Sequence, residues 1–165
     1  MFPPGAVSPP QDGIDTLPGN SKTGKSCLFS AFHEHLSGAH VLVTRQAQRA
    51  IEKACGNPKG WAIPAFCAAE FWAVVTHRSG SPRPSQAGEA RAFLAEMGAA
   101  GAKVLYPRDG FMERLAQLAS NLKIQGLRIF DLQIALVSFE GGASEIWTHD
   151  RHFASLPGLP ARDPL

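Results

Sequence analysis

The sequence predicts an α/β domain in which a parallel sheet lies between helices. Short apolar segments alternate with longer segments of helical spacing after residue 44, and glycine or proline stands at their junctions. Strands that alternate with helices form parallel sheets. A chain of 165 residues with 44% apolar content is long enough for one domain with its own core.

The first elements follow from spacing and punctuation. Apolar residues at helical spacing predict a helix over about 47–55 that ends at Gly56, and residues 61–63 form a short apolar strand. Pro64 suits the first position of the next helix, where its missing N–H costs nothing. That helix, about 65–76, is apolar on nearly every face, which predicts that it is buried.

The later elements are predicted in the same way. Ser85 and Asp109 are expected to cap the helices that follow them. The expected elements are a helix over 85–98, a strand over 103–106, a helix over 110–122, a helix over 131–139 and a strand over 144–148.

The N-terminal segment has a different composition. Residues 1–25 contain several prolines and glycines without apolar periodicity, so we expect a disordered arm before a folded domain over 26–165. A helix is expected within 27–36, and residues 40–43 fit a strand or a helix equally.

The charge and the cysteine content exclude several classes of protein. The formal charge of +2 gives no global basic field, so a bound polyanion must be held by a local patch. Three cysteines at no ligand spacing predict reduced thiols. No apolar run approaches the roughly 20 residues of a membrane span, and no signal peptide is evident. We therefore expect a cytoplasmic protein that does not enter membranes.

Three carboxylates stand out by their placement. Asp150 follows the last predicted strand, Asp131 lies at a predicted helix start, and Glu70 is the one acid in an apolar helix. Sites in parallel sheets form at the carboxyl ends of the strands, and a buried carboxylate is costly unless it is paired or binds a metal. A divalent-metal site is therefore predicted, with Thr148 as an added hydroxyl. Helix capping by Asp131, a turn role for Asp150 and a structural ion pair for Glu70 remain alternatives.

Residues 44–165 resemble the PIN-domain ribonucleases and, among them, the VapC toxins of bacterial toxin–antitoxin pairs. The resemblance rests on the order and spacing of four segments: AEFWAVVTH at 69–77, FD at 130–131 with IA at 134–135, THDRHF at 148–153, and LPGL at 156–159 leading to the terminal PL. It implies a PIN-like three-layer fold with a five-stranded parallel sheet between helices. It also implies an acidic cluster that binds Mg²⁺ or Mn²⁺ for RNA cleavage, a small antitoxin as partner, and a tendency to form homodimers.

By this resemblance, Glu70, Asp131 and Asp150 correspond to the family's metal-binding acids and Thr148 to its accompanying hydroxyl. The oxygen ligands suit a hard cation. Four nearby cationic or imidazole side chains are candidates for RNA phosphates, although an ordinary solvated position is the alternative for each: Lys123, Arg128, Arg151 and His152.

One part of the family pattern is not found. The family's first strand ends in Asp-x-Asn or Asp-x-Ser, but residues 24–30 contain no carboxylate. Asp15 imitates the motif, yet Leu17-Pro18-Gly19 interrupts it and no apolar strand precedes it. We therefore expect the first strand to be missing from the middle of the sheet. The alternative function is a catalytically impaired module that binds an antitoxin or RNA without cutting.

A nucleotide-binding motif falls in the same region. Residues 19–26 match G-x-x-x-x-G-K-[ST], whose backbone N–H groups cradle phosphates in P-loop proteins. The preceding segment is polar and contains proline, whereas a P-loop leaves a buried strand. A flexible segment is the alternative to this third candidate function.

Overall fold

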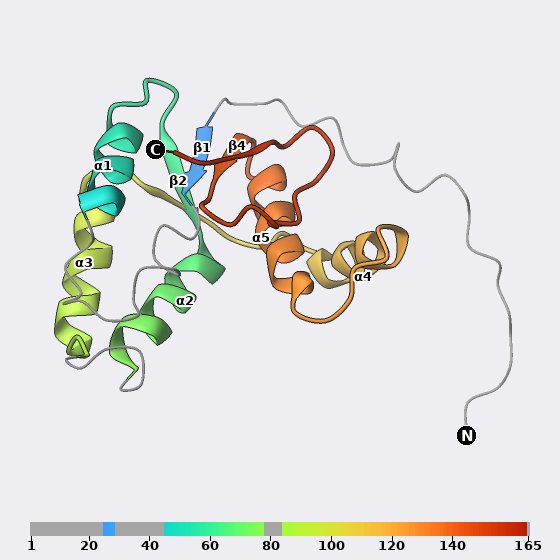
Figure 1. The fold of residues 1–165 in the computed structure, drawn as a ribbon, viewed down its shortest axis with the longest axis horizontal. Coiled ribbons are helices and arrows are strands. Elements are labelled where there is room, and N and C mark those ends of the chain that lie inside the picture. Colours follow the sequence, from blue (N-terminus) through green and yellow to red (C-terminus); the bar gives the residue numbers. More distant parts are fainter. Residues whose placement is uncertain (1–24, 29–44, 78–83, 165) are drawn as a thin grey trace, which may run out of the picture.

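A computed structural model describes residues 25–28, 45–77 and 84–164, with the backbone alone described for 25–28 and 45–47. A five-stranded parallel sheet lies between α1, α2 and α3 on one side and α4 and α5 on the other (Figure 1). The strands are β1 (Lys25–Leu28), β2 (Trp61–Pro64), β3 (Lys103–Leu105), β4 (Ala143–Trp147) and β5 (Ala161–Arg162). The helices are α1 (Arg45–Cys55), α2 (Ala65–Thr76), α3 (Ala87–Ala99), α4 (Phe111–Asn121) and α5 (Arg128–Glu140). This arrangement confirms the predicted fold class.

Strand β1 occupies the centre of the sheet, whose order is β3-β2-β1-β4-β5. Cys27 is paired with Ala62 of β2 and with Ile146 of β4, both in parallel. The prediction of a missing central strand was therefore wrong, and residues 27–28, which we expected could belong to a helix over 27–36, lie in this strand. Lys25–Leu28 has little strand character by itself, and its conformation follows from the neighbouring strands that supply its hydrogen-bond partners.

The strand conformation of β1 also removes the nucleotide-binding alternative. In a P-loop the Lys-Ser pair follows the phosphate-binding loop and opens a helix. Here Lys25 and Ser26 lie inside a strand and pair with β4. The remaining motif positions, 19–24, lie outside the described residues, as do Asp15 and the segments expected over 29–36 and 40–43.

Helix α5 and strand β4 form the most deeply buried part of the core. Residues 134–138 of α5 are fully buried, as are Leu132 and, in β4, Ile146. Gly141 and Gly142 make the tight connection that turns the chain from the end of α5 into β4. The amino end of α5 consequently lies at the same edge of the sheet as the carboxyl end of β4.

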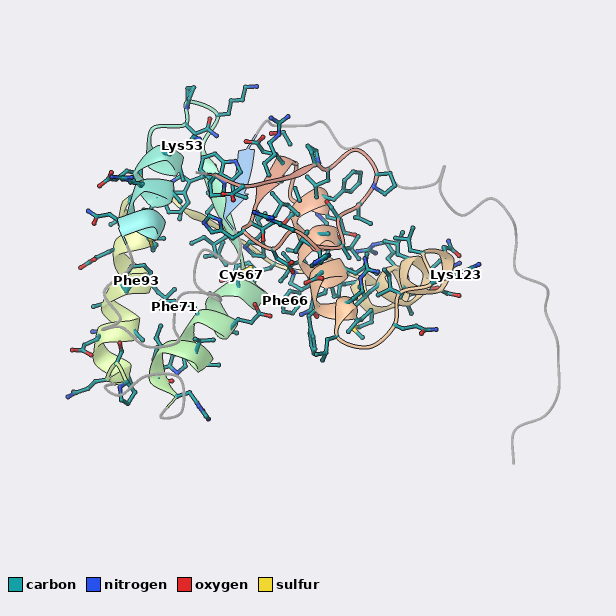
Figure 2. The ribbon with its side chains drawn as sticks, viewed as in Figure 1. Lys53, Phe66, Cys67, Phe71, Phe93 and Lys123 are labelled. Atoms are coloured by element: carbon teal, nitrogen blue, oxygen red, sulfur yellow. The ribbon has the colours of Figure 1, made fainter. Side chains whose placement is uncertain are left out.

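Helix α2 begins and ends where the sequence predicts, but it is buried on one stripe only. Cys67, Phe71 and Val75 are buried at helical spacing, whereas Trp72 is 38% exposed. The Phe71 ring stacks on Phe93 of α3, with ring centroids 4.8 Å apart (Figure 2). Because the helix packs mainly on this partner, its opposite face does not reach the core, and the prediction of full burial was wrong.

Several helix starts differ from the predicted caps. Pro64 closes β2 and is the cap residue of α2, one position before the first helical position that was predicted for it. The cap residue of α3 is Gln86 and not Ser85, and the N–H of Gln86 donates to the Glu89 carboxylate at 2.8 Å. The N–H of Ser85 donates to the carbonyl of Val75. Gly110 caps α4 in place of Asp109. Helix α5 begins three residues earlier than predicted, which puts Asp131 within its first turn and not at its cap.

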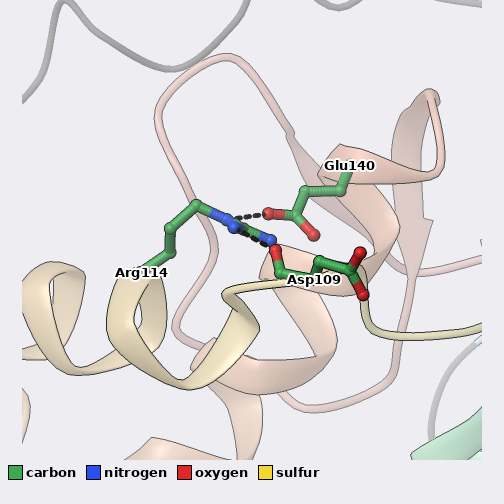
Figure 3. Close-up of polar contacts among 3 residues, drawn as sticks. All are labelled: Asp109, Arg114 and Glu140. Atoms are coloured by element: carbon green, nitrogen blue, oxygen red, sulfur yellow. Dashed lines mark hydrogen bonds and ion pairs between the residues drawn. The ribbon is translucent and has the colours of Figure 1, made fainter.

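A partly buried ion pair joins α4 to the end of α5. Arg114 Nε contacts Glu140 Oε1 at 2.5 Å, and Arg114 Nη1 donates to the backbone carbonyl of Asp109 at 2.6 Å (Figure 3). Gly110 has a φ of 71°, and a Cβ at this position would lie 2.9 Å from Arg114 Nη1. The turn before α4 therefore requires glycine, which has no Cβ and adopts positive φ readily. The hydrogen bond to Glu140 is the main reason that the pKa of Arg114 is raised.

No helix in the described ranges has the length and hydropathy that crossing a bilayer requires.

We predict that the variant Arg114→Met lowers the free energy of unfolding by about 2 kcal/mol, because it leaves the largely buried Glu140 carboxylate without a countercharge. The double variant Arg114→Met/Glu140→Leu is expected to be closer to wild type than Arg114→Met alone. Urea denaturation of both single variants and the double variant gives the coupling. If the double variant loses as much free energy of unfolding as the two single variants lose together, this account is contradicted.

Candidate metal centre

Asp150 is fixed by a tight turn at the carboxyl end of β4. The backbone N–H of Thr148 donates to the carbonyl of Arg162 at 2.9 Å, which holds the start of the turn against β5. The Thr148 hydroxyl oxygen accepts the N–H of Asp150 at 3.0 Å, and Asp150 Oδ1 accepts the N–H of His152 at 2.7 Å. The turn-forming role of Asp150 is thus confirmed. The same hydrogen bonds orient its carboxylate, so a turn role and a ligand role are compatible.

Asp131 lies opposite this turn, in the first turn of α5. Its Oδ2 accepts the backbone N–H of Ala154 at 3.4 Å. Burial raises the pKa of Asp131, and the negative charge of Asp150 raises it further, while the Ala154 hydrogen bond and the charge of Arg128 lower it. The net shift is upward. Asp131 is tied by the Ala154 N–H to the segment that follows Asp150, which brings the two carboxylates within electrostatic range.

The fold therefore brings together two acids that are 19 positions apart in the sequence. Two carboxylates in one place are unfavourable, because each charge disfavours ionisation of the other. A divalent cation between them removes this cost, and Mg²⁺ is commonly held by one or two carboxylates together with water and substrate phosphates. Asp131 and Asp150 are chemically suited to such an ion.

Glu70 does not complete a three-acid cluster. It lies in α2 and is only partly buried. Among the described residues, no three histidine, cysteine, aspartate or glutamate side chains are grouped closely enough to hold one metal ion. Glu70 lies on α2, whereas Asp131 lies on α5. A metal-binding role for Glu70 stays a prediction.

The predicted RNA-binding side chains divide into two groups. Arg128, Arg151 and His152 are exposed and belong to the segments that carry the two acids. Lys123 lies at the outer end of α4, in a turn with a φ of 53° (Figure 2). The first three are therefore better placed than Lys123 for an RNA at this site.

Sequence reasoning missed the contribution of Ala154. The backbone N–H of Ala154 donates to Asp131. Any residue except proline has such a donor, so the residue type at position 154 does not predict this contact. It also missed β5 and the side chains on it, because two residues are too few to give a periodic pattern.

The PIN domain family model matches residues 31–159 of this chain, which covers more than half of its length. The chain belongs to the PIN domain family. Proteins with this domain are typically metal-dependent nucleases, and they generally bind RNA and use divalent ions. No curated protein matches the chain.

We predict that Asp131→Asn raises the thermal unfolding temperature at pH 7. Because the folded-state pKa of Asp131 is raised, ionisation destabilises the fold progressively as pH rises above the usual Asp value of about 3.9. The neutral amide avoids this penalty, and each kcal/mol relieved corresponds to about 2–4 °C. Below that pH the gain should disappear.

Scanning calorimetry from pH 3 to pH 8 measures this effect, with Asp109→Asn as the exposed control. Added Mg²⁺ should stabilise wild type and the control but not Asp131→Asn. Equal destabilisation of Asp131→Asn at every pH would indicate a structural role for Asp131 and contradict the prediction.

Proposed function

We propose that this protein is a metal-dependent endoribonuclease of the VapC toxin type, which cuts RNA phosphodiesters at Asp131 and Asp150. The observation that supports the proposal is that the first turn of α5, with Asp131, is hydrogen-bonded to the turn after β4 that contains Asp150, at one edge of a PIN-domain sheet. The ion would be Mg²⁺ or Mn²⁺, both of which take oxygen ligands.

The residues have separate roles in this proposal. Asp131 and Asp150 would hold the ion, with Glu70 as the proposed third acid, and Thr148 orients Asp150 through its hydroxyl oxygen. A bound divalent ion supplies an activated water and neutralises charge that develops on the phosphate. Arg128, Arg151 and His152 would bind neighbouring phosphates, and Lys123 would do so at the edge of the RNA path. Asp15 remains a proposed source of the missing first acid.

The proposed partner is a small antitoxin whose chain covers the acids. Phe130, which directly precedes Asp131, is 48% exposed, and Leu127, the cap residue of α5, is 81% exposed. Large apolar side chains in such positions favour contact with another molecule. A homodimer and a cytoplasmic location belong to the same proposal.

A second candidate is a module of the same fold that binds an antitoxin or RNA without cutting. It is favoured by the sequence of β1, the central strand, which ends at Leu28 without any carboxylate. Both candidate functions include binding of RNA or an antitoxin, but only the first includes RNA cleavage.

We predict that the full chain cleaves a mixed RNA pool with Mg²⁺ or Mn²⁺ and stops when EDTA is added. Asp131→Asn and Asp150→Asn should each reduce the rate at least about 100-fold, because the ion supplies several kcal/mol of transition-state stabilisation. Asp109→Asn, an exposed carboxylate in the turn before α4, is the matched control and should cleave like wild type. A folded chain that binds RNA but does not cut it would support the second candidate.

We also predict that Leu28→Asp increases cleavage. Leu28 is the last residue of the central strand β1, and the family's first strand ends in an acid. Leu28 pairs with Trp147 at the end of β4, three positions before Asp150. A new carboxylate there adds an oxygen ligand, so we expect tighter Mn²⁺ binding and a rate gain of about tenfold.

The control for this gain is Cys27→Asp, which adds the same charge one position earlier in the strand. Both variants are first checked for folding by circular dichroism. Equal rates for the two folded variants and wild type would contradict the interpretation that β1 lacks only its terminal acid.

A further inference from the structure

A second polar feature includes Asp150 but not Asp131. A pocket of about 170 Å³ lies between the turn after β4 and the edge strand β5. Asp150 forms part of its wall, so whatever occupies the pocket is next to the proposed metal centre. The buried residues Thr148 and Phe153 also line it, and both are fixed by the core.

The side chains around the pocket come from both segments. Arg151 follows Asp150 in the turn, while Arg162 and Asp163 come from β5 and its end. His149 Nδ1 lies 3.0 Å from Asp163 Oδ1, which ties the turn to the end of β5. Residues more than ten positions apart therefore form one continuous rim.

Arg162 is held in place by the sheet. It pairs with Trp147 in the ladder, and its Nε lies 3.3 Å from Glu145 Oε2. The other oxygen of Glu145 accepts the indole N–H of Trp147 at 2.8 Å, so Glu145 is itself positioned. A guanidinium has five N–H donors in a fixed plane. The contact with Glu145 leaves the terminal nitrogens of Arg162 available to a ligand, as judged from the described part of the chain.

The composition of the pocket identifies the class of ligand. Two guanidinium groups are balanced by the carboxylates of Asp150 and Asp163, so a bare anion gains little net attraction. The lining instead supplies hydrogen-bond donors from Arg151 and Arg162 and acceptors from Asp150 and Asp163, and the buried Phe153 contributes to its wall. Proteins recognise unpaired bases of RNA through arginine planes and through polar contacts to the base edges.

We propose that this pocket receives the unpaired nucleotide next to the phosphodiester that is cut, and so selects the cleavage position in single-stranded RNA. Arg162 is the residue that contacts this nucleotide, with its planar guanidinium against the base. The proposal rests on the proposed function, since that function makes RNA the ligand of the adjoining acids.

Binding is measured with the full chain carrying Asp131→Asn, which removes cleavage from the assay. The probe is a fluorescein-labelled single-stranded 12-nucleotide RNA of mixed sequence, followed by fluorescence anisotropy. Adding Arg162→Ala should weaken binding about tenfold, the effect of losing a charged hydrogen bond. The control Arg91→Ala, an exposed arginine on α3, should bind like the parent.

Two results of this assay would overturn the proposal. One is equal affinity of the Arg162→Ala and Arg91→Ala proteins for the single strand. The other is equal affinity of the parent for the same RNA as a duplex, whose bases are not available to a pocket. If Arg162→Ala fails to fold, Arg162→Gln keeps the side-chain stem and a donor to Glu145 and takes its place.

Cleavage by proteins with an intact Asp131 separates this proposal from the proposed function. If wild type cuts RNA, Arg162→Ala should shift the positions of the cuts, and an unchanged pattern would contradict the pocket while the nuclease stands. If wild type cuts nothing but binds single strands through Arg162, nucleotide binding by the pocket stands, while its selection of a cleavage position and the nuclease both fail.

Discussion

The parallel pairing of β1 between β2 and β4 is the constraint on which the candidate site depends. Because all the strands of the sheet run in one direction, the ends of β1, β2 and β4 lie at one edge. The turn after β4 and the start of α5 meet at that edge, which is how Asp150 and Asp131 become neighbours. Without the central strand, β2 and β4 would have no common partner and the two halves of the sheet would separate.

Two carboxylates in this protein illustrate different uses of a partly or largely buried acid. Glu140 is neutralised by Arg114 at 2.5 Å, an arrangement that ties α4 to α5 and needs no ligand. Desolvation by burial is the main cause that raises the pKa of Asp131, and the negative charge of the nearby Asp150 raises this pKa further. Unfavourable electrostatics of this kind concentrate at functional sites, where a ligand supplies the compensation. The physical contrast supports a structural role for Glu140 and a binding role for Asp131.

The sequence predicted the regular elements where pattern and packing agree, and failed where tertiary partners decide. The bounds of helix α2 were predicted correctly, since an apolar run follows Pro64, although Pro64 is the cap residue and not the first helical residue. Strand β1 was missed because Lys25–Leu28 is a strand only through pairing on both sides. The convergence of Asp131 and Asp150 could be predicted from the rule for parallel sheets, whereas the Ala154 N–H and the pocket at β5 depend on loop geometry that no residue pattern encodes.

The central claim, that Asp131 and Asp150 bind one divalent cation, is tested most directly by crystals of the full chain soaked in Mn²⁺ and measured for anomalous scattering. We predict a single strong anomalous peak within about 2.5 Å of carboxylate oxygens of both residues, and no such peak in crystals of Asp131→Asn. A peak elsewhere, or none at these two side chains in well-ordered wild-type crystals, would contradict the claim.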